Sequence, residues 1–498
     1  MTDVHLEYIN DVHVRVKAER SILMELGEAL TYYKENYKFD PKYKARMWDG
    51  KIRLLNGLTS ILYAGLAQRV QKFCADNDYT FSFDEKLVYD NVSVNEINEL
   101  LDSLNLPDWL ERRDYQVEAI VKCLRSRRRT LVSPTSSGKS LMIYAITMWY
   151  KQKTLIIVPR TGLVNQFKSD LESYGFTGVI HTSIEGLMQD NDIPADIVIT
   201  TWQSLDNGKK KRSKDWFNQF KVVFGDEAHG CKATTLIKIL SSMEHTPYRF
   251  GTTGTLDKNN LNKATIEGLF GPVYTSTTTR DLIDEGHAAD IKIKCIVLKY
   301  PEEVRKEFHK SVKVAGSTKV KKKTYQEEID FITKYEPRLQ FIKNLALSLE
   351  GNKLVFFRIV NHGRAIYDSI KANHDRVFYI AGDVNTADRE HIRKSLEDED
   401  GATLVASLGT TSTGISIKRL HHMISTHPSK AEITLRQAIG RMLRQHDQKE
   451  VAYMYDIVDD ISYGAKKNYA LTHFEARSDI YDQEQFDYKI YTVKLKWS

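Results

Sequence analysis

The chain has 498 residues, which is too many for a single hydrophobic core, and the usual domain size of about 100–200 residues indicates roughly three structural units. Hydrophobic residues make up 41% and charged residues 28%, as is typical of globular proteins, and no apolar run is long enough to span a membrane. The polar first residues also lack the apolar segment of a signal peptide. A formal net charge of +6 permits a polyanionic partner but does not require one.

The cysteines are scattered along the chain without the spacing of metal ligands. We therefore expect a reduced, intracellular protein without structural zinc. The four cysteines are Cys74, Cys123, Cys231 and Cys295.

Residues 1–95 are expected to form a small α+β domain. Between residues 39 and 55, basic residues alternate with aromatic and apolar ones, and Asp49-Gly50 favours the positive φ values of a two-residue turn. We therefore predict a β-hairpin with one charged face, whose aromatic residues could stack on nucleic-acid bases. A solvated hairpin with a buried tryptophan is the alternative. The candidate nucleic-acid contacts are Lys44, Arg46 and Trp48.

An acidic stretch at 84–104 is expected to connect this domain to an α/β domain at 106–288. Short apolar strands separated by helical patterns recur through the second domain. This alternation indicates a parallel sheet with ligands at the carboxyl ends of its strands. The predicted strands are 130–133, 154–158, 197–201, 222–225 and 249–252.

The first of these strands leads into the loop Ser133–Ser140 (SPTSSGKS), which an apolar-periodic helix follows. Such a loop is a phosphate cradle, because its backbone N–H groups and the positive end of the helix face an anion. Lys139 would add a positive charge and Ser140 a hydroxyl for Mg²⁺. Ser133 departs from the full P-loop pattern, which begins with glycine. A solvated Gly-Lys turn is the alternative for an isolated match, and the flanking strand and helix disfavour it.

A second chemical site directly follows the predicted strand 222–225, where the chain reads Asp226-Glu227-Ala228-His229 (DEAH). Asp226 can hold Mg²⁺ through water, and Glu227 can orient and deprotonate the water that attacks a γ-phosphate. Acidic loop ends are common, so the match depends on the phosphate cradle upstream. Together the two sites predict hydrolysis of a nucleoside triphosphate.

A second α/β domain is expected at 291–470, followed by a carboxyl-terminal extension at 471–498. Its sequence contains no second phosphate cradle. Near its end, Arg441 and Arg444 are three residues apart on a predicted helix and would share a face. A basic surface helix is the alternative. The predicted strands are 354–358, 377–380, 403–407, 423–426 and 452–457.

Eight motifs stand in an order typical of one enzyme superfamily. They are RDYQ at 113–116, PTSSGKS at 134–140, VPRT at 158–161, TTWQ at 200–203, DEAH at 226–229, GTTGT at 251–255, STGIS at 412–416 and QAIGRMLR at 437–444. The chain resembles superfamily 2 helicases of the DExH type, and more closely the phage UvsW-type helicases, whose amino-terminal domain has a similar K-x-R-x-W-D-G stretch. The resemblance covers nearly the whole chain. It implies an α/β fold of two tandem RecA-like parallel-sheet lobes with a small α+β amino-terminal domain.

The resemblance also implies that ATP and Mg²⁺ bind between the lobes. Arg113 and Gln116 match the motif that reads adenine, and Gln437 is expected to bond the γ-phosphate or the attacking water. Arg441 and Arg444 match arginine fingers that stabilise the transferring phosphoryl group. The expected nucleotide-binding residues are Arg113, Gln116, Thr135, Ser136, Ser137, Gly138, Lys139, Ser140 and Gly414. The expected catalytic residues are Lys139, Asp226, Glu227, Gln437, Arg441 and Arg444, with Ser140 and Asp226 holding Mg²⁺ largely through water.

Positions that match the strand-tracking residues of such helicases occur in both lobes. Hydroxyls and arginines suit phosphate oxygens, which position a strand without reading its sequence. A helix cap or strand end is the alternative for each threonine. The expected contacts are Arg160, Thr161, Thr200, Thr201, Arg358 and Ser407.

The predicted function is therefore that of an ATP-dependent DNA helicase or translocase. The resemblance implies branched DNA as substrate, namely forks, Holliday junctions, D-loops and R-loops, in replication, recombination and repair. The alternatives are an RNA-dependent ATPase of the same superfamily and an ATP-regulated strand-annealing protein. We expect a monomer in the cytoplasm, of the host cell if the protein is phage-encoded, without membrane association. Recombination or single-strand-binding proteins are expected as partners, and RNA could be bound in R-loops.

Overall fold

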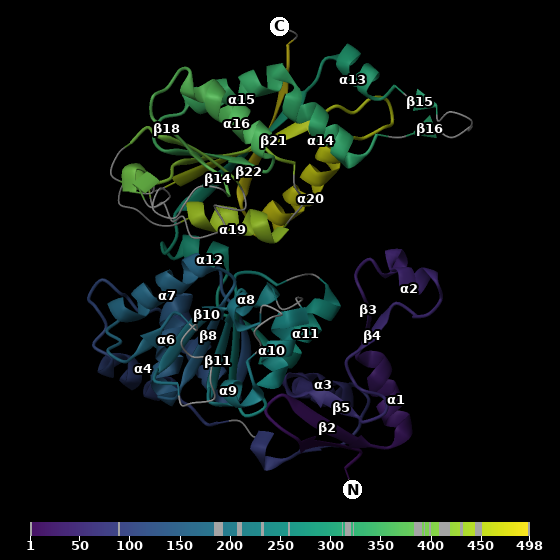
Figure 1. The fold of residues 1–498 in the computed structure, drawn as a ribbon, viewed down its shortest axis with the longest axis vertical. Coiled ribbons are helices and arrows are strands. Elements are labelled where there is room, and N and C mark those ends of the chain that lie inside the picture. The colour runs from purple at the N-terminus through teal and green to yellow at the C-terminus, as the bar shows by residue number, and fades with distance from the viewer. Residues whose placement is uncertain are drawn as a thin grey trace. The chain divides into compact units, whose positions relative to one another are not determined.

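The computed structural model describes residues 2–87, 90–183, 193–206, 212–230, 234–256, 259–310, 312–313, 320–321, 323–382, 391–392, 394–397, 400–407, 419–428, 432–443 and 451–496. The chain forms two compact units, Met1–Thr277 and Thr278–Ser498 (Figure 1). The first unit contains the amino-terminal domain and the P-loop lobe (lobe 1), and the second contains the other α/β lobe (lobe 2). None of the helices in the described part of the chain combines the length and apolar character needed to cross a membrane.

The amino-terminal domain is built on a mixed four-stranded sheet in the order β5-β2-β1-β6. Apolar residues alternate along its strands, so that Leu6 and Val14 are buried against Leu26 of α1 and Val70 of α3. The elements are β1 (Val4–Tyr8), β2 (His13–Ala18), α1 (Arg20–Ala29), β3 (Thr31–Tyr33), α2 (Pro41–Lys44), β4 (Lys51–Arg53), β5 (Ile61–Tyr63), α3 (Ala67–Asp76) and β6 (Phe81–Phe83), with short 3-10 turns at Tyr37–Phe39, Ala64–Leu66 and Glu85–Leu87.

The prediction of a β-hairpin around Asp49-Gly50 is wrong. The segment before this turn is the short helix α2, and β4 pairs antiparallel with β3, which lies well upstream. The Asp40 side chain caps α2 by accepting a hydrogen bond of 3.0 Å from Lys42 N, and Pro41 occupies the first helical position. An aspartate followed by proline is a helix-start signal, and it overrides the alternation of charged and aromatic residues.

The acidic connector contains a helix, α4 (Val94–Ser103), that packs on lobe 1. Ser93 and Glu96 form a reciprocal capping box at its start, and Ile97 and Leu101 are buried in the core of lobe 1. The amino-terminal domain also contacts lobe 1 directly, because Arg69 Nε donates a 2.5 Å hydrogen bond to Glu267 Oε2.

Lobe 1 has a seven-stranded sheet in the order β13-β7-β12-β11-β8-β10-β9, in which every pairing is parallel. The sheet is buried on both faces: Ile156 and Phe224 face the core with α5 and α6, whereas Leu155 and Val223 face α9 and α10. All five predicted strands are confirmed. The strands are β7 (Arg128–Val132), β8 (Thr154–Val158), β9 (Ile180–His181), β10 (Ile197–Thr201), β11 (Val222–Asp226), β12 (Tyr248–Thr253) and β13 (Val273–Thr275). The helices are α5 (Asp114–Ser126), α6 (Lys139–Tyr150), α7 (Thr161–Ser173), α8 (Trp202–Leu205), α9 (Lys214–Asn218), α10 (Thr234–Ser242) and α11 (Asn260–Phe270), with a 3-10 turn at Ala228–Gly230.

Lobe 2 has a second parallel seven-stranded sheet, in the order β18-β19-β17-β20-β21-β14-β22. This confirms the expected fold class of two RecA-like lobes with a small α+β domain. The five predicted strands are present, and β14 and β22 are additional. The strands are β14 (Asp290–Lys299), β17 (Lys353–Phe357), β18 (Val377–Ile380), β19 (Thr403–Ser407), β20 (His422–Ser425), β21 (Val451–Asp460) and β22 (Asp487–Lys494). The helices are α12 (Thr279–Asp284), α13 (Glu302–Phe308), α14 (Tyr325–Lys334), α15 (Glu336–Ser348), α16 (Val360–Lys371), α19 (Glu432–Met442) and α20 (Tyr469–Gln483). Two short strands, β15 (Val312–Lys313) and β16 (Val320–Lys321), pair antiparallel.

The carboxyl-terminal segment, expected as an extension, belongs to the body of lobe 2. Its strand β22 pairs in parallel with β14 at the edge of the sheet, and its helix α20 is anchored to β21 by Arg477, whose Nε donates a 2.8 Å hydrogen bond to Asp456 Oδ2. Most residues of β22 are exposed, so the segment has no strong apolar signal that would predict a strand.

A buried ion pair joins several elements of lobe 2. Arg338 of α15 is fully buried and donates to both carboxylate oxygens of Asp459 in β21, at 2.7 and 3.0 Å. It also donates to the carbonyl of Thr426, at 2.6 Å, and Tyr300 OH donates to Asp459 at 2.9 Å. The charge of each partner is therefore compensated in an apolar surrounding.

Replacing Arg338 with methionine should lower the free energy of unfolding of lobe 2 by about 3–5 kcal/mol, because Asp459 would stay buried without its cation. Urea unfolding, with hydrogen exchange of the β21 amides, measures the loss. Arg280→Met is the matched control, because its partner Asp284 is exposed on α12, and it should change the midpoint little. Equal midpoints for the two variants would contradict this account.

Candidate nucleotide and nucleic-acid sites

The phosphate cradle connects β7 to α6, as its sequence predicts. Lys139 Nζ donates to the carbonyls of Ser133 and Pro134, at 2.9 and 3.0 Å, which holds the ammonium group over the loop. The departure from the P-loop pattern has a structural role: Ser133 Oγ donates to Ser137 Oγ at 2.5 Å and accepts from Ser276 Oγ at 2.9 Å. Ser137 Oγ continues this chain to the carbonyl of Pro134, at 2.7 Å. Linked hydroxyls therefore brace the loop from inside.

The RDYQ motif supports the same loop from the start of α5. Gln116 is buried, and its amide donates to the carbonyl of Ser137, at 2.9 Å, while its oxygen accepts from Arg113 N at 3.0 Å. Arg113 Nη1 donates to the carbonyl of Ser136, at 3.1 Å, and Tyr115 OH donates to that of Ser137, at 3.0 Å. These contacts assign Arg113 and Gln116 a role in shaping the loop, and adenine recognition by them stays a prediction.

Gly138 lies where the loop turns into α6, with a φ of +77°. A Cβ atom there would meet Gln116 Nε2 at 2.3 Å, so the backbone conformation favours glycine and any larger residue would displace the Gln116 amide. The loop residue Ser136 also has a positive φ, of 69°. Only a well-supported loop holds a non-glycine residue in this region.

The DEAH segment begins at Asp226, the last residue of β11, at the same edge of the sheet as the cradle. Asp226 Oδ1 accepts a 2.9 Å hydrogen bond from Thr252 Oγ1 of the neighbouring strand β12. Glu227 has a φ of 52°, a left-handed conformation that costs about 1–3 kcal/mol for such a residue and is typical of functional sites.

His229 connects the DEAH segment to β12. Its Nδ1 lies 3.1 Å from Glu227 Oε2 and 3.0 Å from Thr253 Oγ1. The carbonyl of Thr253 in turn accepts a 2.8 Å hydrogen bond from the backbone N–H of Ser133. Because β12 lies between β7 and β11, these bonds join the phosphate cradle to the carboxylate pair. His229 belongs to the DEAH motif, but the motif alone predicted no role for it.

The carboxylate pair suits a divalent cation. Burial, and then the nearby Glu227, raises the pKa of Asp226, whereas Lys139 acts in the opposite direction. A cation would relieve the cost of ionising two neighbouring carboxyl groups in a buried site. Asp226 and Ser140 therefore fit the expected Mg²⁺ ligands. Ser140 Oγ lies 2.8 Å from the hydroxyl of Tyr174, a buried residue at the end of α7 that no sequence pattern indicated.

The predicted strand contacts of lobe 1 lie along the same edge, beyond the carboxylate pair. Arg160 and Thr161 follow β8 and are exposed at the start of α7, and Thr200 and Thr201 end the adjacent strand β10. Thr200 and Thr201 are buried, and Thr201 Oγ1 caps α8 by accepting from Ser204 N at 3.3 Å. The structure therefore favours a structural role for Thr201, and a nucleic-acid contact remains a prediction for all four residues.

In lobe 2, Arg358 directly follows β17, and Ser407 is the last residue of β19. Because Phe357 of β17 pairs with Ser407, Arg358 and Ser407 lie at the same carboxyl edge of that sheet. Arg358 is exposed there. Gln437 is half-buried on α19, and Arg441 lies on the same helix. Gly414 and Arg444, together with the whole STGIS motif, lie outside the described residues, and so does the side chain of Arg441.

The basic and aromatic stretch of the amino-terminal domain is exposed at α2 and the following turn. Lys44 and Arg46 are exposed, and Trp48 is half-buried, with its Nε1 donating to the carbonyl of Lys51 at 3.0 Å. Lys34 Nζ lies 5.6 Å from the centre of the Trp48 ring. Phe39 and Met47 are also largely exposed here. Cations and apolar groups therefore share one exposed surface, although on a helix and a turn rather than on a hairpin.

Two parallel-sheet lobes, with a phosphate cradle braced by an RDYQ segment and a DEAH pair in the first, define the class of superfamily 2 helicases. Family models agree in chain order: "DNA helicase UvsW, N-terminal" matches residues 3–84, "Type III restriction enzyme, res subunit" matches 110–258, and "Helicase conserved C-terminal domain" matches 338–446. The ATP-dependent DNA helicase uvsW of Enterobacteria phage T4 is 34% identical over 99% of this chain and 100% of that protein. The chain belongs to the UvsW family of DNA helicases.

Two solved structures illustrate the similarity, one with a related sequence and one with a much more distant sequence. The crystal structure of T4 UvsW is 33% identical, with a TM-score of 0.49, and the match covers 99% of this chain and 100% of that chain. The ATP-dependent Type ISP restriction-modification enzyme LlaBIII bound to DNA is 14% identical, with a TM-score of 0.57, over 77% of this chain and 32% of that one. The second similarity concerns the fold alone.

Replacing Gly138 with alanine should weaken ATP binding by more than about tenfold, because the added methyl group strains the turn and displaces Gln116 from the cradle. Titration with a fluorescent ATP analogue measures the affinity. Gly230→Ala is the control, since a Cβ there meets nothing within 4 Å, and it should bind ATP as the wild type does. Unchanged affinity in Gly138→Ala would contradict the proposed role of this glycine.

Proposed function

We propose that this protein is an ATP-dependent DNA helicase that translocates along a strand and remodels branched DNA. The observation that carries the proposal is the carboxyl edge of lobe 1. There, β7 and β11 bring together the phosphate cradle and the carboxylate pair, and β8 and β10 bring the candidate strand contacts next to them. Membership of the UvsW family supports ATP as the energy source and DNA as the substrate.

In the proposed reaction, Lys139 binds the β- and γ-phosphates, while Glu227 orients the attacking water and accepts its proton. Mg²⁺ held by Asp226 and Ser140 would neutralise charge on the transferring phosphoryl group. His229 positions the Glu227 carboxylate relative to Thr253 on β12. A change at the phosphates can therefore reach the end of β12 through hydrogen bonds.

The second lobe is proposed to supply Arg441 and Arg444 as arginine fingers and Gln437 as a contact to the γ-phosphate or the attacking water. Such a finger contributes roughly 10³–10⁵ in rate. ATP would draw the lobes together and hydrolysis would release them. Strand contacts such as Arg160 and Arg358 would then change separation, and the enzyme would step along one strand.

Branched DNA suits such a motor on energetic grounds. Branch migration loses base pairs on one arm and gains them on another, whereas plain unwinding loses about 1.4 kcal/mol of stacking per step. We propose that the exposed surface around Lys44, Arg46 and Trp48 binds the branch. Its cations would contact phosphates, and its aromatic residues could stack on unpaired bases. The substrates would be forks, Holliday junctions, D-loops and R-loops.

An RNA-dependent ATPase of the same superfamily is the nearest alternative, because contacts to phosphates do not distinguish DNA from RNA well. An ATP-regulated annealing protein is the other. We propose a monomer that acts in the cytoplasm of the host cell, with recombination or single-strand-binding proteins as partners.

ATPase activity should rise most strongly with forked DNA, less with single strands and linear duplex, and least with RNA, because only the fork engages both the lobes and the amino-terminal surface. Steady-state hydrolysis with each nucleic acid, at several salt concentrations, measures this order. Greater stimulation by RNA than by any DNA would instead support the RNA-dependent alternative.

Glu227→Gln is the control for this experiment. It keeps the shape of the site but removes the base, so ATP binding should persist while hydrolysis and fork unwinding are lost. If Glu227→Gln remodels forks as fast as the wild type does, the protein is not an ATP-driven motor.

The triple variant Lys44→Ala, Arg46→Ala and Trp48→Ala should bind forked DNA about tenfold more weakly, while its basal ATPase stays near the wild-type rate. Fluorescence anisotropy with a labelled fork measures affinity. The double variant Lys17→Ala and Arg20→Ala, which removes exposed cations elsewhere in the same domain, is the control and should bind as the wild type does. Equal fork affinity for the triple variant would refute the branch-binding surface.

A further inference from the structure

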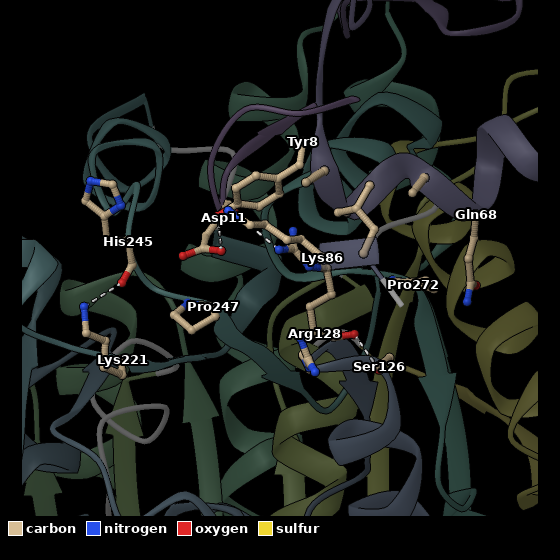
Figure 2. Close-up of a pocket in the computed structure, with 15 residues that line it drawn as sticks. Tyr8, Asp11, Gln68, Lys86, Ser126, Arg128, Lys221, His245, Pro247 and Pro272 are labelled. Carbon is tan, nitrogen blue, oxygen red and sulfur yellow. Dashed lines mark hydrogen bonds between the residues drawn. The ribbon is translucent and has the colours of Figure 1, made fainter. Parts of the chain in front are cut away.

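A cavity of about 460 Å³ lies between the amino-terminal domain and lobe 1 (Figure 2). Its lobe 1 side consists of residues at the beginning of strands: Arg128 starts β7, and Lys221, Pro247 and Pro272 directly precede β11, β12 and β13. Because all strands of this sheet are parallel, these residues form its amino edge, and the phosphate cradle lies at the opposite edge. The cavity is therefore separate from the nucleotide site.

Cationic side chains outnumber carboxylates among the described residues that line this cavity. Lys86 reaches it from the amino-terminal domain, and Arg128 and Lys221 reach it from lobe 1 (Figure 2). Arg127 also lines it, but Asp90 neutralises this guanidinium through hydrogen bonds of 2.7 and 2.5 Å. Besides that pair, the cationic lining residues are Lys86, Arg128 and Lys221, and Asp11 is the one lining carboxylate among the described residues.

The one lining carboxylate among the described residues belongs to Asp11, and it accepts a hydrogen bond from a neighbouring tyrosine. Its Oδ1 accepts a 2.9 Å hydrogen bond from Tyr8 OH, while the Asp11 carbonyl accepts a 3.0 Å bond from Arg128 Nη2. The second of these bonds fixes the guanidinium at the boundary between the two domains. Figure 2 shows the Asp11 side chain next to the Tyr8 ring, with Arg128 below them.

Neutral groups hold the two lysines in place. Lys86 Nζ lies 4.9 Å from the centre of the Tyr8 ring, and Lys221 Nζ donates to the carbonyls of Asn218 and His245, at 3.1 and 3.2 Å. A cation held by carbonyls or an aromatic ring keeps its full charge available for an anion. These contacts place both lysines, and neither is paired with a carboxylate of the residues that the structure describes.

We propose that this cavity binds a phosphate group, and that the backbone of the DNA substrate supplies it. Phosphate oxygens accept hydrogen bonds from ammonium and guanidinium groups together, and a recessed site strengthens that attraction because less water screens it. The volume lies within the range of about 300–1,000 Å³ that is usual for small-ligand sites, so it admits one phosphate with its sugar rather than a duplex.

The proposed phosphate site would give the DNA a second anchor, away from the edge along which the strand is tracked. Both domains supply a cation to it, so a bound phosphate would also tie the amino-terminal domain to lobe 1. The inference that DNA supplies the phosphate depends on the function proposed above, whereas the inference that the cavity binds a phosphate group does not.

The test compares the full-length wild type with the double variant Lys86→Glu and Lys221→Gln. Inorganic phosphate should raise the melting temperature of the wild type more than that of the variant, and any binding at the P-loop is common to both proteins. With forked DNA, the variant should bind about tenfold more weakly at low salt, and the slope of log affinity against log salt should fall by about one for each lost phosphate contact. Basal ATPase should not change.

Lys168→Glu, on α7 and outside the cavity, is the control and should match the wild type in both measurements. Equal phosphate stabilisation in the wild type and the double variant would overturn the phosphate site. A lost phosphate response with unchanged fork affinity and salt slope would overturn the DNA source and indicate a free phosphate compound instead. If the wild type itself does not bind forks, the proposed function fails while the phosphate comparison still stands.

Discussion

The parallel arrangement of the lobe 1 sheet is the constraint on which the rest of this structure depends. Because every strand runs in the same direction, the residues that follow the strands meet at one edge, although they are distant in sequence. The insertion of β12 between β7 and β11 then sets the spacing between Lys139 and Asp226. The threonines of β12 fill that space with hydrogen bonds, so the nucleotide site is a property of the sheet and not of any single loop.

The strained residues of the site depend on the same support. Glu227 and Ser136 have positive φ values that each cost about 1–3 kcal/mol, and the surrounding structure has to offset this cost. The linked hydroxyls of Ser133 and Ser137, and the amide of Gln116, hold the loop from two sides. Rigidity of this kind lets a motor convert a change at the phosphates into movement elsewhere, because a soft loop would absorb it.

The opposite edge of the same sheet serves the amino-terminal domain. Contacts such as the bond from Arg69 to Glu267 join this domain to lobe 1, and the cavity with Lys86 and Arg128 lies where they meet. The same sheet thus carries the nucleotide site at its carboxyl edge and the cavity lined by cationic residues at its amino edge. Lobe 2 is stabilised differently, by fully buried ion pairs such as that of Arg338 with Asp459.

The sequence by itself determined the fold class, the ten predicted strands and the order of the motifs, because alternation of apolar strands with helices and the chemistry of the P-loop are local signals. Prediction from the sequence failed at residues 41–44, where the helix-start signal of Asp40-Pro41 outweighed the strand-like alternation. It also failed at β22, whose mostly exposed residues form no apolar pattern. It could not show that Ser276 and Tyr174 contact the phosphate cradle, or that Lys86 and Lys221 face one cavity. Only the tertiary structure decided these points, because each is a contact between residues that folding alone brings together.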